Sequence, residues 1–513
     1  MTALARIGGR GSFPPALLAV AAIPGLLVAL PVAYALMRSG EAGFAGVVRE
    51  LTRPMTLELL SNTLTLAVCV TVLTVILGIA AAWLTERCDI PLPGLWRVVA
   101  SAPLAMPALV SSYAWSSLGP QFQGMGGAIG ILTLACVPLV YLPVAAALRT
   151  LDPGFEDVAR SLGRGPWSTF FTIVVPQAAP AMLGGALLVS SHMLAEFGAL
   201  AFLQVQTFTT AIFQQYEMQF DNATAALFSS VLLAMTVPLA LGEMRLRHGR
   251  RFSRSGKGTA RDAQIIKLGW MRIPAVAGFG LFGVLAIGVP FWMLIYWLFT
   301  GTSVGMGLER LAPAIAGSLS YSLSGGLVTT LLAIPLVLAS MRLRGWLVTT
   351  AERLPYVIHG LPGLVVALAL VFFAIRYVPP LYQSPALVVI AYVMLYLPLA
   401  QSAIRASAEL VPPELEDVAR TLGKGPFTAF MEVTLPNLLP GVGASLAMVV
   451  LQLMRELTAT LLLAPSGVVT LATEFWTYTN DRAFAAAAPF AAVLVIVSGV
   501  PVYIFTLRTL RRS

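Results

Sequence analysis

The sequence predicts an all-α polytopic membrane protein of two parallel six-helix repeats, with room for about 12 transmembrane helices at about 20 apolar residues each. Three observations predict this fold: the composition, a series of long apolar runs and an internal repeat. Of the 513 residues, 58% are hydrophobic and only 11% are charged, whereas a soluble globular chain has about 25% charged residues. This composition excludes a secreted, cytosolic or nucleic-acid-binding enzyme.

The apolar runs have the length of helices that cross a membrane. We expect helices because they satisfy their own backbone hydrogen bonds in lipid. The runs lie at 16–37, 62–84, 99–117, 126–148, 182–204, 223–243, 273–299, 320–341, 357–375, 385–404, 441–463 and 484–507. The first run is too long for the apolar region of a signal peptide and lacks a cleavage site of small residues, so we expect an uncleaved span.

The basic residues of the short loops predict the orientation, because loops rich in Lys and Arg stay in the cytoplasm. One set of loops, with the middle segment and the C-terminal tail, holds most of them: Arg87, Arg97, Arg149, Arg160, Arg164, Arg342, Arg344, Arg353, Arg405, Arg420, Lys424, Arg508, Arg511 and Arg512. The opposite loops hold Arg38, Arg49, Arg53, Arg310, Arg376 and Arg482. We therefore expect both termini in the cytoplasm. The net charge of +9 then reflects this orientation, and we expect no nucleic-acid partner.

A basic polar segment, Arg245 to Arg272, divides the chain. We expect a first repeat at 1–243, a cytoplasmic linker at 244–272 and a second repeat at 273–513. Gly256-Lys257 does not form a phosphate-binding loop, since no glycine lies five positions earlier and no strand precedes it. We therefore expect no ATPase site, no enzymatic activity and no cofactor bound by this chain.

The internal repeat is most evident in two loops. The sequence EDVARSLGRGPWSTFFTIVVP at 156–176 matches EDVARTLGKGPFTAFMEVTLP at 416–436, and the match continues without a gap to Glu196 and Glu456. Each half has six expected spans, so both copies have the same orientation. Parallel repeats of this kind are related by an axis along the membrane normal, and a transport path lies between them.

Each of these loops predicts a short helix with no core of its own. The helix would end at Gly163 or Gly423, a residue type that favours helix C-termini. The Gly-Pro pairs at 165–166 and 425–426 then predict a turn. Such a helix needs an external surface to dock on, or it lies on lipid headgroups as an interfacial helix. The near-identical spacing of two loops favours docking.

The loop pattern resembles the EAA motif of ABC-importer permeases, EAA-x3-G-x9-I-x-LP. The first copy matches with Asp157-Val158-Ala159, Gly163, Ile173, Val175 and Pro176, and the second with Asp417-Val418-Ala419, Gly423, Val433, Leu435 and Pro436. Both copies have Asp-Val in place of Glu-Ala, with Glu156 or Glu416 directly before it. Two fused halves in one chain further resemble the ferric-iron transport permeases, and thiamine permeases are also fused.

This resemblance implies a type I ABC-importer permease fold in the bacterial inner membrane. In that family the loop helix is the coupling helix, which seats in a groove of an ATPase subunit. The coupling residues implied here are Glu156, Asp157, Ala159, Gly163, Pro176, Glu416, Asp417, Ala419, Gly423 and Pro436. The implied partners are two ATP-binding subunits, expected as a homodimer that holds ATP and Mg, and an extracytoplasmic substrate-binding protein. The implied mechanism is alternating access.

Two acidic residues, Glu196 and Glu456, lie at equivalent positions within otherwise apolar spans. A carboxylate there costs several kcal/mol unless it faces water, a partner or a cation. A lone acid could be structural, paired for example with Arg455, but two related acids predict a gate that handles cations. Facing carboxylates attract a multivalent cation and repel oxyanions such as sulfate. The hypothesis is a transient contact with ferric iron, which prefers carboxylate to the nearby His192.

Other interpretations stay open at this point. Thiamine, a polyamine or an aminophosphonate are alternative substrates of an importer permease. A secondary transporter of twelve spans would explain the hydropathy and the acids, but not the two matched loops. The outer loops at 206–222 and 464–482 offer Gln214, Tyr216, Trp476 and Tyr478 as contacts for a binding protein, although an interfacial belt of aromatic residues gives the same composition.

Overall fold

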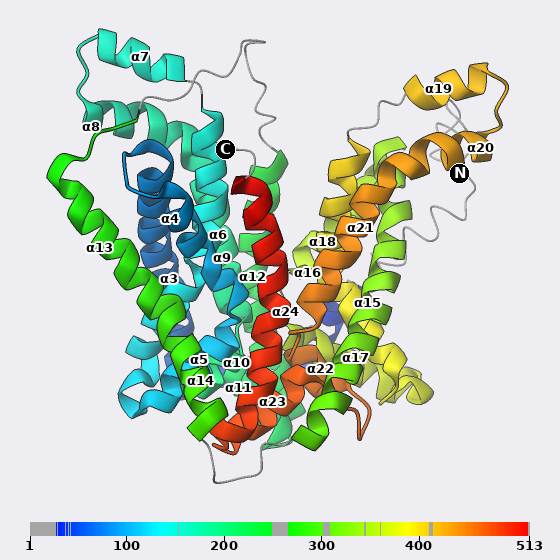
Figure 1. Ribbon diagram of the computed structural model, residues 1–513. Helices are drawn as coiled ribbons and strands as arrows, with labels where there is room; N and C mark the ends of the chain where they lie inside the picture. Colours follow the sequence, from blue (N-terminus) through cyan, green and yellow to red (C-terminus); the bar gives the residue numbers. More distant parts are fainter. Residues whose placement is uncertain are drawn as a thin grey trace. The chain divides into compact units, whose positions relative to one another are not determined.

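Helices form nearly all of the regular secondary structure in the part of the chain that the structure describes (Figure 1). The computed structural model describes residues 27, 29–35, 37–38, 40–41, 43–151, 153–248, 265–300, 308–342, 345–359, 361–409 and 414–510. Among these residues the only β pairing is a single bridge between Cys88 and Ile266. The predicted all-α class is confirmed.

The chain forms two compact units, which we describe separately. The larger unit comprises Met37–Gly317, Gly360–Leu364 and Val469–Ser513. The smaller unit comprises Ser318–His359 and Val365–Val468, together with the described residues before position 36.

The larger unit holds most of the helices. In chain order they are α2 (Gly43–Leu51), α3 (Pro54–Arg87), α4 (Pro93–Ser101), α5 (Ala108–Leu118), α6 (Gly124–Thr150), α7 (Pro153–Ser161), α8 (Pro166–Thr169), α9 (Val175–Ala195), α10 (Gly198–Phe202), α11 (Phe208–Glu217), α12 (Asn222–His248), α13 (Arg272–Gly283), α14 (Val289–Thr300), α23 (Leu471–Asn480) and α24 (Phe484–Leu510). Short 3-10 turns lie at Ala102–Ala105, Pro120–Phe122 and Gly269–Met271, and π-helical turns at Phe170–Val174 and Val284–Gly288.

The smaller unit begins within α15 (Leu308–Arg342). It continues with α16 (Trp346–His359), α17 (Gly363–Tyr377), α18 (Pro385–Ala408), α19 (Glu414–Thr421), α20 (Pro426–Ala429), α21 (Leu435–Leu453) and α22 (Thr458–Leu463). A 3-10 turn lies at Pro379–Leu381 and a π-helical turn at Phe430–Thr434.

The long helices overlap the predicted apolar runs, although the runs at 182–204, 357–375 and 441–463 each cover parts of two helices. Within the described residues, eight are long and apolar enough to cross a membrane: Pro54–Arg87, Gly124–Arg149, Phe170–Ala195, Asn222–Glu243, Gly269–Thr300, Leu308–Met341, Pro385–Ala408 and Phe430–Leu453. A ninth run is bent by 88° between Pro93–Ala105 and Ala108–Leu118, and the apolar helices Gly363–Tyr377 and Phe484–Gly499 are shorter. The first predicted run, at 16–37, lies mostly outside the described residues.

Proline explains the bent run. Pro103 lies in the 3-10 turn after α4, and Pro107 directly precedes α5 with an extended ψ of 139°. Proline has no N–H for the helical ladder and disfavours a helical conformation in the residue before it. The predicted run at 99–117 is therefore two short helices.

Small residues bring the central helices of each unit close together. A Cβ atom at Gly78 of α3 would lie 2.8 Å from the Val140 side chain of α6, and one at Gly185 of α9 would lie 3.0 Å from the Val140 backbone. In the smaller unit, a Cβ atom at Gly325 of α15 would lie 2.7 Å from the Tyr392 ring of α18. Glycine at these positions permits the close helix contacts that are common in membrane proteins.

Helices from the second repeat pack within the larger unit. The rings of Trp297 in α14 and Phe484 in α24 stack with centroids 5.4 Å apart. The Tyr113 hydroxyl of α5, a first-repeat helix, donates a hydrogen bond of 2.6 Å to the Phe484 carbonyl. The boundaries of the compact units therefore differ from those of the two sequence repeats.

The last residues of the expected linker are hydrogen-bonded to the end of α3 and the residues directly after it. The Ile266 N–H donates to the Arg87 carbonyl at 2.8 Å, and the Asp89 N–H donates to the Ile266 carbonyl at 3.1 Å. The Leu268 N–H donates to the Asp89 carboxylate at 2.7 Å. Of the expected linker at 244–272, residues 249–264 lie outside the described part of the chain.

Candidate functional site

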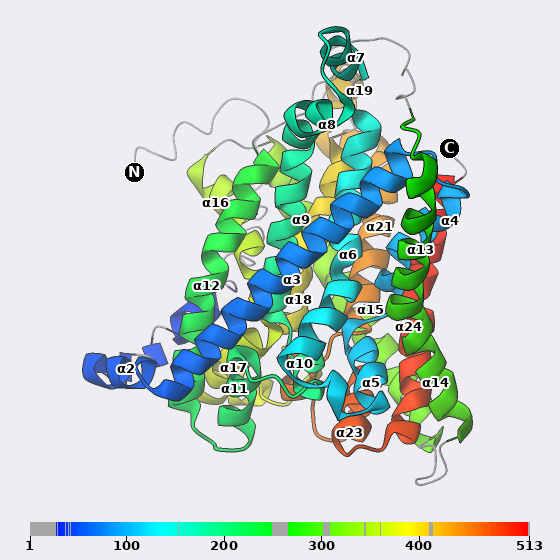
Figure 2. The same cartoon turned by 90° about the vertical axis from the view of Figure 1, so that its left-hand side faces the viewer.

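The first predicted loop helix is α7. It lies beyond the long helices at one end of the larger unit, and α5, α10 and α11 lie at the other end (Figures 1 and 2). Gly163 follows α7 with φ of +81°, a left-handed conformation that glycine adopts without strain. The Arg164 N–H donates to the Ala159 carbonyl at 3.1 Å. This is the hydrogen bond of a glycine-terminated helix.

The second loop helix, α19, ends in the same way. Gly423 has φ of +82°, and the Lys424 N–H donates to the Ala419 carbonyl at 3.1 Å. The predicted glycine C-termini of both helices are confirmed. Equivalent sequences therefore fold into the same local structure in two different units.

The alanines of the motif lie beneath the loop helices. Ala159 and Ala419 are buried, since α7 packs on α8 and the π-helical turn after it, and α19 packs on α20 and its own π-helical turn. A larger side chain at either position would push the loop helix away from its support. The small residue of the motif is thus explained by packing within the loop.

Apolar side chains of both loop helices face outward. Leu162 and Leu422 are each 75% exposed, and Val158 and Val418 are also exposed. Residues four apart lie on one face of a helix, so each loop presents an apolar stripe. An exposed apolar stripe of this kind indicates an interaction surface.

Each loop is braced by a polar contact between its glycine turn and the π-helical turn. The Arg164 guanidinium donates to the Thr172 hydroxyl at 3.0 Å. In the second loop, the Lys424 ammonium pairs with the Glu432 carboxylate. The residue pairs differ, but they join the same two parts of the loop.

The acidic residues of the motif are only partly described. Glu416 accepts a hydrogen bond from the Thr434 hydroxyl in the π-helical turn. The side chains of Glu156, Asp157 and Asp417 lie outside the described part of the structure, although their backbones belong to α7 and α19.

The prolines of the motif follow the π-helical turns. The Val175 N–H donates to the Phe170 carbonyl, and the Leu435 N–H donates to the Phe430 carbonyl, which is the wider spacing of a π turn. Pro176 and Pro436 come next and are exposed. The π turn shifts the backbone hydrogen bonds of the helix by one residue. Proline fits directly after this shift because it has no N–H that would need a partner.

The two acids within the apolar spans lie at helix breaks. Glu196 separates α9 from α10, and its Oε1 accepts a hydrogen bond of 3.0 Å from the Ala199 N–H. Glu456 separates α21 from α22, and its Oε1 accepts a hydrogen bond of 3.2 Å from the Ala459 N–H. Each acid stands directly before the N-cap residue, Phe197 or Leu457, and caps the short helix by accepting from an N–H in its first turn. Glu196 belongs to the larger unit and Glu456 to the smaller.

Arg455 does not provide the pairing considered for Glu456. Its guanidinium donates instead to the Gln452 side chain. The hydrogen bonds that the Glu456 carboxylate accepts come from the Tyr396 hydroxyl, the Thr458 hydroxyl and the Ala459 N–H.

A buried acid that sequence reasoning missed lies near the first loop. Glu86, at the end of α3, has a side chain only 3% exposed. Arg97 of α4 donates to both of its oxygens, at 3.0 and 3.1 Å, and Arg149 of α6 donates to both at 2.7 Å. The signal that the sequence contains for this contact is an acid, Glu86, followed by basic residues in the same loops.

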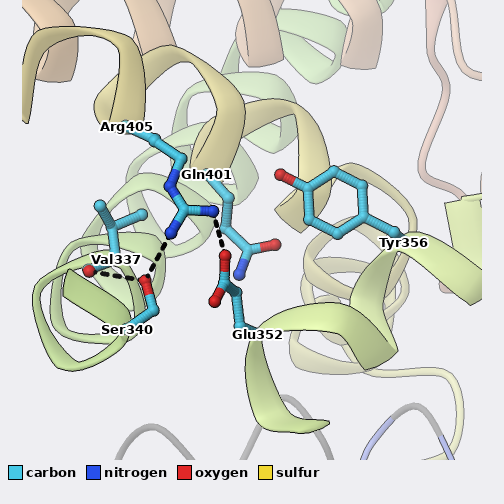
Figure 3. Close-up of a pocket in the computed structure, with 6 residues that line it drawn as sticks. All are labelled: Val337, Ser340, Glu352, Tyr356, Gln401 and Arg405. Carbon is cyan, nitrogen blue, oxygen red and sulfur yellow. Dashed lines mark hydrogen bonds and ion pairs between the residues drawn. The ribbon is translucent and has the colours of Figure 1, made fainter. Parts of the chain in front are cut away.

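The smaller unit has a related contact in a small pocket (Figure 3). Arg405 of α18 pairs with Glu352 of α16 and donates to the Ser340 hydroxyl of α15 at 3.1 Å. Figure 3 also shows Gln401 and Tyr356 beside this pair. In both units, an arginine late in the helix before the loop is thus bonded to an acid on a neighbouring helix.

Trp476 is a packing residue. It is buried, and its ring stacks on Phe202 at 5.0 Å and lies 5.0 Å from Phe197. Tyr478 likewise stacks on Phe490 at 5.5 Å. The aromatic composition of the loop at 464–482 therefore comes at least in part from internal packing.

Comparisons with known proteins agree with this architecture. Residues 74–244 and 332–512 each match the family described as binding-protein-dependent transport system inner membrane component. The chain is 45% identical over 484 residues to the Fe(3+)-transport system permease protein FbpB 2 of Haemophilus influenzae, a match that covers 94% of this chain and 96% of that protein.

More distant relatives match less than half of the chain. The sulfate transport system permease protein CysT of Escherichia coli is 25% identical over 250 residues, which cover 44% of this chain and 90% of that protein. The molybdenum transport system permease protein ModB of Azotobacter vinelandii is 31% identical over 206 residues, which cover 36% of this chain and 91% of that protein. The chain therefore belongs to the family of binding-protein-dependent transport system inner membrane components, as an integral membrane permease with two fused copies of the family domain.

Proposed function

We propose that this chain is the permease of an ATP-driven importer of ferric iron. The observation that carries the proposal is the pair of matched loops, each with a glycine-terminated helix, a buried alanine and an exposed apolar stripe. The iron substrate is supported by the match over nearly the full length to a permease whose name gives Fe(3+) transport. The sulfate and molybdenum permeases match over less than half of this chain.

The stripes on α7 and α19 would be the docking surfaces for the ATPase subunits. A leucine that is 75% exposed on each loop helix, Leu162 or Leu422, provides apolar area for a groove on a partner. The two loops end with the same backbone geometry, so they fit two identical ATPase subunits. ATP and Mg would be held by those subunits, and this chain would hydrolyse no ATP. The coupling role extends to the motif residues Glu156, Asp157, Pro176, Asp417 and Pro436.

The orientation that we propose follows from the basic loops. The loops with α7 and α19 would face the cytoplasm, as would both termini and the linker at 244–272, which joins repeats at 1–243 and 273–513. The substrate-binding protein would then dock at the opposite ends of the units. Closure of the ATPase subunits would move the loop helices and alternate the access of the path.

The substrate path would pass the helix breaks at Glu196 and Glu456. Carboxylates at these positions favour a cation over sulfate or molybdate. Thiamine or a polyamine is also cationic and remains the second class of substrate, and an aminophosphonate is the third. A secondary transporter would need no ATPase partner, so partner capture separates it from an importer.

Co-purification tests the proposed function. The affinity-tagged full chain, extracted from its native membrane, should bring down two nucleotide-binding subunits. Leu162→Asp together with Leu422→Asp should abolish this capture, because a charge in an apolar interface is costly to bury. Leu118→Asp is the matched control, since Leu118 is an exposed leucine at the end of α5, remote from α7. If the intact chain brings down no nucleotidase, the coupling proposal is wrong.

The substrate is tested by uptake. Cells that lack the native chain should regain uptake of 55Fe supplied as ferric citrate when the intact chain returns, and excess thiamine or spermidine should not compete. Competition by either organic cation would move the assignment to that substrate class.

A further inference from the structure

The two acids at the helix breaks have equivalent positions but different surroundings. Both Glu456 oxygens accept hydrogen bonds. Oε1 accepts from the Thr458 hydroxyl at 2.7 Å and from the Ala459 N–H at 3.2 Å, and Oε2 accepts from the Tyr396 hydroxyl. The Glu456 carboxylate is therefore occupied by the protein itself.

The Glu196 carboxylate is occupied on one side only. Oε1 accepts from the Ala199 N–H at 3.0 Å. His192 of α9 has its Nε2 3.7 Å from Oε2, close enough to form an ion pair when the imidazole is protonated but beyond hydrogen-bond distance. Within the described residues, Oε2 accepts no hydrogen bond.

Two differences between the repeats account for this, one in the sequence and one in the partner of an equivalent tyrosine. Gly198 stands where the second repeat has Thr458, so the first break has no hydroxyl beside the carboxylate. Tyr141 stands where the second repeat has Tyr396, but its hydroxyl lies 3.3 Å from the Thr85 hydroxyl of α3. At the two positions equivalent to Thr458 and Tyr396, the first repeat therefore provides no hydroxyl that donates to Glu196.

The side chains of His192 and, to a smaller extent, Glu196 are also exposed to solvent or lipid. The His192 side chain is 43% exposed, and that of Glu196 is 13% exposed. His192 lies within the apolar span Phe170–Ala195, where polar groups that face lipid are costly and normally line a water-filled path instead. This face of α9 is therefore suited to line the path.

We propose that Glu196 is the carboxylate that contacts the transported cation, through Oε2 and beside His192, whereas Glu456 is a positioning residue. This assignment rests on the proposed function as a cation importer. One oxygen that accepts no hydrogen bond within the described residues, next to one imidazole, is a small set of ligands for a multivalent cation, so the contact is brief, as transport requires. Glu456 instead fixes the geometry of the break between α21 and α22.

Glutamine separates the two roles. A glutamine keeps a carbonyl oxygen that can accept from the following N–H, but it has no charge. At position 456 it preserves the cap and the contact with Thr458, and its amide can donate to the Tyr396 oxygen. At position 196 it preserves the cap to Ala199 but removes the attraction for a cation.

The experiment compares Glu196→Gln, Glu456→Gln and Glu456→Ala in the full chain, co-expressed with its ATPase partners. Uptake of 55Fe from ferric citrate should fall about tenfold or more in Glu196→Gln, since a loss of about 1.4 kcal/mol already gives a factor of ten. Glu456→Gln should retain uptake within about twofold, an effect of a few tenths of a kcal/mol. Glu456→Ala should lose uptake and should unfold at a lower temperature in detergent.

A second readout tests the positioning role without any substrate. The thermal unfolding temperature of the purified complex should be lowered by Glu456→Ala and restored by Glu456→Gln. Equal losses of uptake in the two glutamine variants, or full uptake in Glu196→Gln, would overturn the assignment. Absence of iron uptake by the intact chain would instead refute the proposed function, while the unfolding comparison would still decide the role of Glu456.

Discussion

The guanidinium of Arg149 forms two hydrogen bonds of 2.7 Å with the carboxylate of Glu86. This contact joins the last turn of α6, directly before the loop helix α7, to the end of α3. Arg97 binds the same carboxylate from α4. Three helices of the larger unit are thus fixed to one another at the end where the loop helix emerges, which gives α7 a rigid base.

We predict that Glu86→Ala destabilises the protein. Glu86 is buried, and its loss leaves two guanidinium groups close together without their acid, an effect of about 2 kcal/mol or more. Thermal unfolding in detergent measures the change. Glu50→Ala is the matched control, since its partner Arg53 is 55% exposed and such pairs contribute about 1 kcal/mol or less. Equal unfolding temperatures for the two variants would contradict the prediction.

We predict that Gly163→Ala and Gly423→Ala impair the attachment of ATPase subunits. A Cβ atom meets no other atom within 4 Å at either glycine, so the cost is that of the left-handed backbone, about 1–2 kcal/mol per residue. The helix end should shift, and fewer nucleotide-binding subunits should co-purify. Gly165→Ala and Gly425→Ala are matched controls, because these glycines also have open space but no positive φ. Equal capture by all four variants would argue against the helix ends as part of the docking surface.

We predict that the Cys88 thiol is unreactive in the folded protein. Burial, with a smaller contribution from the neighbouring Asp89 carboxylate, raises the pKa of Cys88 from 9.0 to about 11. The thiolate is the reactive form, so maleimide should label this residue at pH 8 only after unfolding. Since the folded state holds its proton more tightly, unfolding becomes more favourable as the pH rises from 9 to 11. Mass spectrometry after labelling measures the fraction of Cys88 that has reacted. Rapid labelling of Cys88 in the folded protein would contradict the prediction.

We predict that Trp476→Ala destabilises the larger unit by about 3 kcal/mol or more, the usual effect of removing a buried aromatic ring. Trp270→Ala is the matched control, because Trp270 is 78% exposed. Thermal unfolding compares the two variants. A wild-type unfolding temperature for Trp476→Ala, with loss of binding-protein attachment, would show that Trp476 acts at the surface.

The local structure of the loops was predictable from their sequences. Gly163 and Gly423 were expected to end short helices, and both have positive φ values, because helix termination depends on a few neighbouring residues. The apolar runs likewise gave the positions of the long helices, since hydropathy reflects the cost of each segment in water. The bend between α4 and α5 follows from prolines that the sequence already contains.

Contacts between distant residues were not predictable in this way. Glu86 and Trp476 each lie among partners from several helices, and no local pattern marks which helices will pack together. Glu196 and Glu456 illustrate the limit most clearly. Their positions in the sequence are equivalent, but the Tyr396 hydroxyl reaches Glu456, whereas the Tyr141 hydroxyl lies against Thr85.

The sequence by itself determined the helical class, the internal repeat, the approximate positions of the spans and the ends of the loop helices. These properties follow from hydropathy and from the backbone preferences of glycine and proline, which act over a few residues. Only the tertiary structure decided which helices form each compact unit, which acids are buried with arginines, and which of the two acids at the helix breaks has an oxygen that accepts no hydrogen bond within the described residues. Side chains acquire their partners when distant helices pack, and that packing depends on the shapes of whole helix surfaces.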